Sequence, residues 1–377
     1  MADHLTQANQ PRLLSLDFFR GVTIIAMIMV NNPGNGFHVY KLLEHAQWNG
    51  CTPADLIFPF FLFIMGVSIP YAMDKKKHII PHRNIILQSG KRMLILIALG
   101  LFLSLFPAFD FANVRIPGIL SKIGVVYFCC VCLYLRNTME WQFWIFSFLL
   151  LAYYFLMVLI PMPGAGYPNL EPGTNLATWV DRKVFTDAHL YKPYSPYNPA
   201  ELLTTITAIA TGISGMLTGM WLKLKSRSER NKISWMFAAG LVLIGLGLGW
   251  SLFFPLNKSL WTSSFVLYTS GWAIIGLAVS YWLIDVLGYK KFTKPFVVFG
   301  ANAITVYFLS IFIKRIARMI QVPYHESHSN SWDFVYQTIF EPFFNPYTAS
   351  LIFTLVLLMG WMTLLWWMYN KRIIVKI

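Results

Sequence analysis

The chain has 377 residues, of which 56% are hydrophobic, 17% aromatic and only 12% charged. A soluble domain carries about twice that charged fraction. Together with a mean hydropathy of +0.55, the composition therefore excludes an ordinary soluble protein and indicates a polytopic membrane protein. The net charge of +14 does not indicate nucleic-acid binding, because the Lys and Arg residues lie in short loops, where they fix membrane orientation.

Ten apolar segments are long enough to cross a bilayer. Because a bilayer requires each segment to satisfy its own backbone hydrogen bonds, we predict an all-α fold with about ten transmembrane helices, forming one domain over residues 1–377. The first segment lacks a small-x-small cleavage site, so we expect a retained helix rather than a signal peptide. The segments are 13–30, 55–73, 91–106, 119–135, 141–160, 202–222, 235–254, 264–287, 295–313 and 349–369.

The distribution of Lys and Arg predicts the orientation of these helices. The loops and tails on the side of both termini carry 19 of these residues, the opposite side carries 10, and Arg20 lies within the first segment. This bias predicts that both termini are cytoplasmic. Residues 31–54 and two long segments, 161–201 and 314–348, then face the outer compartment, where we expect the two long loops to pack over the first.

The outer segment between the first two helices combines residue types that are suited to acyl transfer. His45 is a general base near neutral pH, Asn31 ends the preceding helix, and Glu44, Trp48 and Asn49 surround the histidine in sequence. A lone loop histidine is more often an ordinary polar residue, and this alternative stays open. His325-Glu326-Ser327-His328 lacks the H-E-x-x-H spacing, so no metal site is predicted.

Two charged positions have both a structural and a functional interpretation. Asp17 and Arg20 lie three residues apart and share a helix face, so they form an ion pair or line a cofactor channel. Thr52-Pro53-Ala54-Asp55 has the pattern of a helix start with a capping-box acid, although Asp55 can also orient His45.

Other polar residues are candidates for binding. Arg115 and Lys258 lie beside helices on the outer side, against the charge bias, and Asn302 is an intramembrane amide that bonds a helix carbonyl or lines a pocket. The run Lys75-Lys76-Lys77 is either a signal for membrane orientation or, with Arg83 and Arg92, a phosphate-binding surface. Three of the four cysteines lie in one apolar segment, and no structural disulfide is expected.

Ordered blocks of sequence across most of the chain resemble the transmembrane acyltransferases typified by heparan-α-glucosaminide N-acetyltransferase. The blocks are SLDFFRG (15–21), EHAQWNGCTPADLIFPFFLFIMG (44–66), RIPGIL (115–120), YNPAELL (197–203), PLNKSLWTSSFV (255–266) and PFVVFGANAITVY (295–307). The block YNPAELL (197–203) departs from the corresponding family pattern, which is nearer to Tyr-Asp-Pro-Glu-Gly. The luminal N-terminal part of the lysosomal enzyme is also missing, as in bacterial members.

The resemblance implies transfer of an acetyl group from cytosolic acetyl-CoA to an amino sugar or glycan acceptor across the membrane. It assigns catalysis to His45, as base or acetyl carrier, and to Asn31. We predict acceptor contacts from Glu44, Trp48, Asn49, Asp55, Lys258 and Asn302, and acetyl-CoA contacts from Asp17, Arg20, Arg92 and Arg115. We expect a multi-pass protein in the lipid bilayer of the inner (plasma) membrane. We expect no nucleic-acid partner and no metal, and a homodimer is compatible with the sequence.

Two other functions remain compatible with the sequence. A transporter of amino sugars or related solutes also has about ten helices, aromatic outer loops and intramembrane polar residues. An O-acyltransferase that acts on envelope glycans uses the same parts on a different acceptor.

Overall fold

Helices dominate the computed structural model of the chain, which describes residues 13–190, 201–324 and 327–375. Strands occur within these ranges only as a short antiparallel hairpin of β1 (Gln321–Tyr324) and β2 (Ser327–Asn330), in which Gln321 pairs with Asn330. The predicted all-α class is therefore confirmed.

Nine helices in the described part of the chain are long and apolar enough to cross a membrane, and a bent pair brings the number to ten. The first five are α1 (Leu14–Asn31), α2 (Pro53–Met73) with its short extension α3 (Lys76–Ile79), α4 (His82–Leu105), α5 (Ile119–Arg136) and α6 (Met139–Leu159). The others are α8 (Thr204–Leu222), α9 (Glu229–Trp250), α10 (Ser263–Tyr281), which continues through Trp282–Val286, and α14 (Pro346–Asn370). These bounds agree with a multi-pass membrane protein.

Two predicted segments needed correction. The segment predicted over 295–313 is not one helix: α11 (Lys294–Ala301) and α12 (Ala303–Met319) meet at Asn302 with a bend of 76°. Helix α4 begins at His82, well before the predicted start at residue 91, because a helix continues beyond the apolar run into charged sequence. Apolar content marks the membrane-embedded part of a helix rather than its end.

Glycines allow the central helices to approach closely. A Cβ atom added to Gly215 of α8 would lie 2.0 Å from the carbonyl oxygen of Phe63 on α2, and one on Gly66 would lie 2.1 Å from the carbonyl oxygen of Gly212. Small residues let membrane helices pack backbone to backbone. The inner helices α1, α2, α5, α8 and α10 have half or more of their apolar residues' span buried in the bundle, whereas α4, α6 and α9 have less than a third buried and lie at the periphery.

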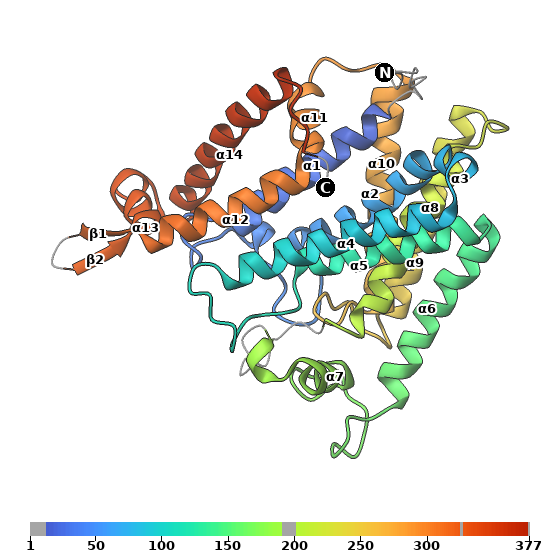
Figure 1. Cartoon of the computed structure of the whole chain (residues 1–377), viewed down its shortest axis with the longest axis horizontal. Helices are drawn as coiled ribbons and strands as arrows, with labels where there is room; N and C mark the ends of the chain where they lie inside the picture. The colour runs from blue at the N-terminus through green and yellow to red at the C-terminus, as the bar shows by residue number, and fades with distance from the viewer. Residues whose placement is uncertain (1–12, 191–200, 325–326, 376–377) are drawn as a thin grey trace.

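The long connections lie away from the end of the bundle at which α14 finishes. Figure 1 shows α11 and the C-terminal end of α14 at the top, while α7 (Leu176–Phe185) lies at the bottom, and α13 (Ser331–Val335) and the hairpin lie at the left. We call the end with these connections the outer end, a name that follows the orientation predicted from the sequence. The short helices Lys41–Leu43, Asp187–His189 and Tyr336–Phe340 also lie in its loops.

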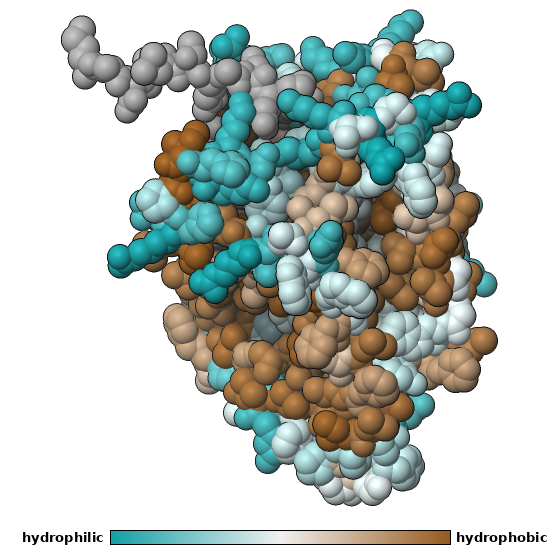
Figure 2. Space-filling model, turned by 90° about the vertical axis from the view of Figure 1, so that its right-hand side faces the viewer, coloured by the Kyte–Doolittle hydropathy of each residue, from teal (hydrophilic) through white to brown (hydrophobic). Residues whose placement is uncertain are grey.

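The surface has the pattern of a membrane-embedded protein. Figure 2 shows hydrophilic residues gathered at the top of one face and a broad hydrophobic band below them. Large apolar side chains are exposed on the peripheral helices, such as Trp144 and Phe148 of α6, at 64% and 67%. Exposed apolar surface of this extent is stable only against lipid.

The two long outer loops contact the first one. The indole N–H of Trp48 donates to the carbonyl of Leu170 at 3.0 Å, and that of Trp332 donates to the carbonyl of Pro33 at 3.3 Å. The phenol of Tyr40 lies 3.0 Å from the hydroxyl of Thr348. The described parts of the long loops therefore contact residues 31–54; positions 191–200 and 325–326 lie outside the described residues.

Candidate active site

His45 and Asp55 line a cavity of about 320 Å³ at the outer end. The sequence Thr52-Pro53-Ala54-Asp55 begins α2, and the carboxylate of Asp55 accepts the backbone N–H of Thr52 at 3.0 Å, as a capping-box acid does. Its other oxygen lies 2.8 Å from Nδ1 of His45. Both interpretations of Asp55 are thus realised: it caps the helix and it holds the histidine.

Lys258 lies beside both ring nitrogens of His45. Its Nζ is 3.3 Å from Asp55 Oδ1, 3.0 Å from His45 Nδ1 and 3.4 Å from His45 Nε2. In the tautomer with its proton on Nδ1, the ring donates to the Asp55 carboxylate, and Lys258 donates to the same carboxylate. Nε2 carries a lone pair in this tautomer, which is the arrangement a general base or nucleophile requires.

Burial shifts the pKa of two groups beside this pair. Burial and the nearby Asp55 carboxylate together raise the pKa of the Cys51 thiol to about 12, against an opposing effect of Lys258. Cys51 is therefore a neutral thiol near pH 7 and an unsuitable nucleophile. Burial also lowers the pKa of Lys258, and the Asp55 carboxylate opposes this effect.

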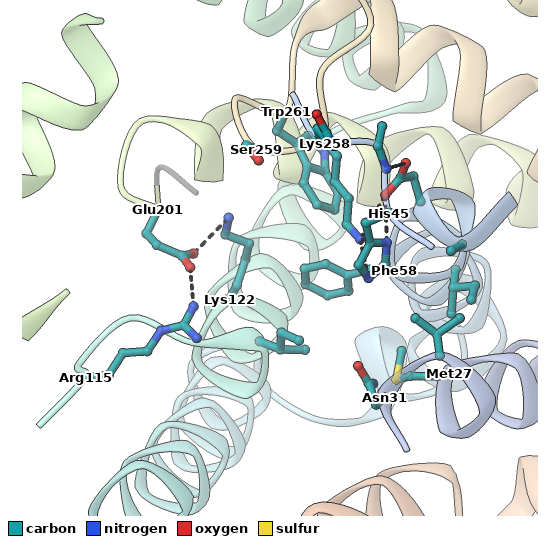
Figure 3. Close-up of a pocket in the computed structure, with 17 residues that line it drawn as sticks. Met27, Asn31, His45, Phe58, Arg115, Lys122, Glu201, Lys258, Ser259 and Trp261 are labelled. Carbon is teal, nitrogen blue, oxygen red and sulfur yellow. Dashed lines mark hydrogen bonds and ion pairs between the residues drawn. The ribbon is translucent and has the colours of Figure 1, made fainter. Parts of the chain in front are cut away.

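Asn31 lies on the wall of the cavity opposite His45, at the last residue of α1, beside Met27 (Figure 3). The backbone carbonyl of Asn31 accepts Nζ of Lys314 from α12 at 2.8 Å. A cation at the carbonyl end of a helix is favourable, because the last carbonyls lack partners within the helix. Lys314 therefore fixes the backbone that carries the Asn31 amide.

The other end of the cavity holds an ion-pair cluster that includes two residues not predicted from the sequence. Glu201 accepts Nη2 of Arg115 at 2.9 Å and Nζ of Lys122 at 3.0 Å (Figure 3). Lys122 is buried and lies above the ring of Trp261, 5.4 Å from its centroid. Two features of the sequence point to these residues. Lys122 is a cation within the apolar segment 119–135, and Glu201 is the acid of the YNPAELL block.

A buried acid supports this cluster from outside the cavity. Both oxygens of Asp181 on α7 accept backbone N–H groups, from Glu201 at 2.6 Å and from Leu202 at 2.9 Å. Burial raises the pKa of Asp181 to about 6, although these two hydrogen bonds oppose the shift. Asp181 thereby sets the position of the chain at Glu201.

Three residues predicted to touch the acceptor hold the loop instead of lining the cavity. Trp48 donates to Leu170, and Asn49 accepts the side-chain amide of Asn257 at 3.1 Å. The backbone carbonyl of Glu44 accepts the hydroxyl of Thr52 at 2.6 Å. These contacts explain how the His45 loop keeps its shape.

A second cavity, of about 390 Å³, lies farther from the outer end, and its wall includes Arg20, Lys76, Arg92 and Asn302. The predicted pair of Asp17 and Arg20 is present at 3.0 Å, and Arg20 also donates to the hydroxyl of Ser68 at 2.7 Å. The guanidinium of Arg92 lies over the ring of Tyr127, 4.6 Å from its centroid, and its buried Nε–H has no hydrogen-bond partner among the described residues.

The structure places two further predicted site residues beside the cavities. Asn302, predicted to touch the acceptor, lines the second cavity at the break between α11 and α12. Arg115, predicted to touch acetyl-CoA, lines the first cavity with His45.

The two cavities are lined by neighbouring turns of the same helices. On α5, Ile119 lines the first and Ile123 the second; on α2, Phe58 lines the first and Phe61 the second. Three or four residues of helix correspond to about 5 to 6 Å of rise. The cavities therefore approach each other from the two ends of the bundle, with about one helical turn between them.

These features define an all-α, multi-pass membrane protein with a histidine–carboxylate cavity at one end and a basic cavity behind it. A protein family described only as a domain of unknown function, DUF5009, matches residues 12–143. That range contains α1, α2, α4 and α5 and the His45 loop.

Two curated proteins resemble most of the chain. The human heparan-alpha-glucosaminide N-acetyltransferase is 32% identical in an alignment that covers 80% of this chain and 53% of the human protein. The mouse protein of the same name is 30% identical in an alignment that covers 81% of this chain and 55% of its own length. The chain thus spans about half the length of these relatives, and the resemblance predicted from the sequence is confirmed.

Proposed function

We propose that the chain is a transmembrane acetyltransferase that moves an acetyl group from acetyl-CoA to the amine of an amino sugar at the outer end. The observation that carries this proposal is the pair of cavities lined by neighbouring turns of α2 and α5. The first cavity contains a base, His45, and the second contains cations. About one helical turn separates the two cavities. The named activity of the human and mouse relatives supports the same reaction class.

The second cavity is suited to the coenzyme. Arg20, Lys76 and Arg92 supply positive charge for phosphate groups, and the buried Nε–H of Arg92 is a donor that an anionic ligand would satisfy. Of the basic residues predicted for this role, Lys75, Lys77 and Arg83 do not line the cavity, and Lys77 pairs with Asp74 at 3.2 Å. The extended pantetheine arm would then reach the first cavity.

The chemistry at His45 follows from the proton on Nδ1. Nε2 removes a proton from the sugar amine as the amine nitrogen attacks the thioester carbonyl. The carbonyl oxygen becomes an oxyanion, for which the side-chain amide of Asn31 is a candidate donor. Collapse breaks the C–S bond, and the thiolate of CoA takes the proton from the imidazolium, while Asp55 holds the ring throughout.

The same geometry also suits a covalent route. Nε2 attacks the thioester and the C–S bond breaks, so CoA leaves as a thiolate and the acetyl group stays on His45 as an acetylimidazolium. The sugar amine then takes the acetyl group, its bond to Nε2 breaks, and the proton that the amine loses passes to solvent. The two routes differ in one measurable species. Incubation with labelled acetyl-CoA in the absence of acceptor, followed by rapid quench and peptide mass spectrometry, detects an acetyl group on His45 only in the covalent route.

Proteoliposomes test the proposed reaction directly. The purified chain is reconstituted, labelled acetyl-CoA is supplied on one side and glucosamine on the other, and the product is identified. Labelled N-acetylglucosamine on the acceptor side supports the transferase. Its absence, with acetyl-CoA on either side, contradicts the proposal.

A solute transporter is the second candidate, because the broken helix at Asn302 lines a cavity, as interrupted helices do in many carriers. The same proteoliposomes separate the two functions. Flux of glucosamine without acetylation favours the transporter. A panel of amino and hydroxyl acceptors then separates N-acetylation from O-acetylation of envelope glycans.

A further inference from the structure

The segment after α14 forms part of the wall of the second cavity. Ile374 and Val375 line this cavity together with Arg20 and Arg92. The segment reaches this place because Arg372 takes a positive φ of 57°, which turns the chain away from the axis of α14. A short stretch outside any helix thus returns to the bundle.

The side chain of Asn302 holds this segment through both of its polar atoms. Nδ2 donates to the carbonyl of Ile373 at 3.2 Å, and Oδ1 accepts the backbone N–H of Val375 at 3.0 Å. Asn302 is only 1% exposed, at the break between α11 and α12. One buried amide therefore makes two hydrogen bonds to the backbone on either side of Ile374.

The residues of this segment are partly exposed. Ile373, Ile374 and Val375 are 41%, 41% and 45% exposed. Apolar packing therefore fixes these residues only in part, and the Asn302 amide contributes much of their order. The backbone N–H of Ile373 also donates to the carbonyl of Met368 at 2.9 Å, so the Asn302 hydrogen bonds matter most for the chain beyond Ile373.

We infer that residues 373–375 are a wall of the acetyl-CoA site and that Asn302 is the positioning residue that holds this wall in place. The inference rests on the proposed function, in which the second cavity binds the coenzyme. The apolar side chains of Ile374 and Val375 exclude water from one side of the cavity, which strengthens the contacts of Arg20 and Arg92 with an anionic ligand. Loss of the wall weakens acetyl-CoA binding without touching His45.

Two variants of the full chain remove the wall in different ways. Asn302→Ala removes the hydrogen bonds, and deletion of residues 373–377 removes the segment. Each is expected to weaken acetyl-CoA binding by about tenfold, since each hydrogen bond contributes on the order of 1 kcal/mol. The combined variant should lose no more than either alone, because both changes act through one element.

Deletion of residues 376–377 alone is the matched control, since it shortens the chain and keeps the held segment. Acetyl-CoA binding is measured by calorimetry, and hydrogen exchange reports the backbone N–H of Val375 separately. Asn302→Ala should abolish protection of this N–H. It should also raise the KM for acetyl-CoA while leaving the KM for the amino sugar unchanged, which a general loss of structure would not do.

The outcomes separate this inference from the proposed function. If the wild-type chain and the control bind acetyl-CoA but both wall variants bind it equally well, the role of the tail is wrong and the transferase stands. If the wild-type chain binds no acetyl-CoA, the proposed function fails and the inference fails with it. Tenfold weaker binding in both variants, with a normal control, supports it.

Discussion

His45 and Asp55 lie ten residues apart in the sequence and are joined by a hydrogen bond of 2.8 Å between Nδ1 and Oδ1. The same carboxylate accepts the backbone N–H groups of Ala46 and Thr52 at 3.0 Å each. One buried acid therefore fixes the start of α2, the backbone beside the histidine and the histidine ring. The position of the proposed base depends directly on the membrane scaffold.

Replacement of Asp55 by Asn should reduce catalysis much more than stability. The Asn side chain is close in shape, but it lacks the charge that holds the Nδ1–H tautomer and stabilises an imidazolium. We expect turnover to fall on the order of a hundredfold or more. Thr52→Ala is the control, because it weakens the same helix start by about 1 kcal/mol and leaves Asp55 in place. Equal turnover losses in the two variants would assign Asp55 a structural role only.

Arg92→Gln should weaken acetyl-CoA binding and leave turnover at saturating coenzyme nearly unchanged. A charge-assisted hydrogen bond to phosphate contributes about 1.5 to 3 kcal/mol, so the KM for acetyl-CoA should rise by about ten- to a hundredfold. Arg83→Gln is the control, since Arg83 is exposed and does not line the second cavity. Steady-state kinetics with each substrate varied in turn measures both constants. A changed KM for the amino sugar alone would contradict this placement.

Asp181 should make the stability of the outer end depend on pH. Its pKa is raised to about 6 in the folded chain, above the ordinary value of 3.8, so the folded state binds more protons between these values. Stability therefore falls as pH rises from about 4 to about 6, by at most about 3 kcal/mol from this residue. Asp181→Asn should flatten that part of a plot of Tm against pH in detergent. An unchanged slope would rule out Asp181 as its source.

Chemical labelling of introduced cysteines tests the orientation predicted from the distribution of Lys and Arg. In a chain whose native cysteines are replaced, a cysteine in place of Arg83 should react only with reagents that reach the cytoplasm. A cysteine in place of Phe37, which is 91% exposed in the loop between α1 and α2, should show the opposite pattern. Labelling of position 83 from the outer compartment in intact cells would show that the predicted orientation is wrong.

Local signals in the sequence predicted local contacts well. The spacing of Asp17 and Arg20 predicted their ion pair, and the pattern from Thr52 to Asp55 predicted the start of α2. Both depend on helix geometry within one turn, which sequence spacing determines. The order of apolar segments likewise predicted the membrane-spanning helices, because the bilayer sets their length.

Contacts between distant segments were not predictable in this way. Arg115 and Glu201 lie 86 residues apart, and Lys122 joins them from inside an apolar helix. Their meeting depends on how α5 and α8 pack, which no local pattern encodes. The break at Asn302 also depends on tertiary contacts, since its side chain bonds a segment 71 to 73 residues away.

The central claim is that His45 carries out acetyl transfer at the outer end of the bundle. His45 lies in a loop and its side chain is 46% exposed, so His45→Ala should alter stability only modestly. Loss of a general base lowers the rate by on the order of a hundred- to ten-thousandfold, and loss of an obligatory acetyl carrier by more. Asn31→Ala should lower it by about a hundredfold, and the two losses should not add fully.

The most direct measurement is the turnover of purified His45→Ala protein with acetyl-CoA and glucosamine, alongside its Tm and its affinity for acetyl-CoA. The account predicts that transfer is lost while the Tm and acetyl-CoA affinity stay close to those of the wild-type chain. A folded His45→Ala protein that binds acetyl-CoA and turns over at a near-normal rate would contradict it.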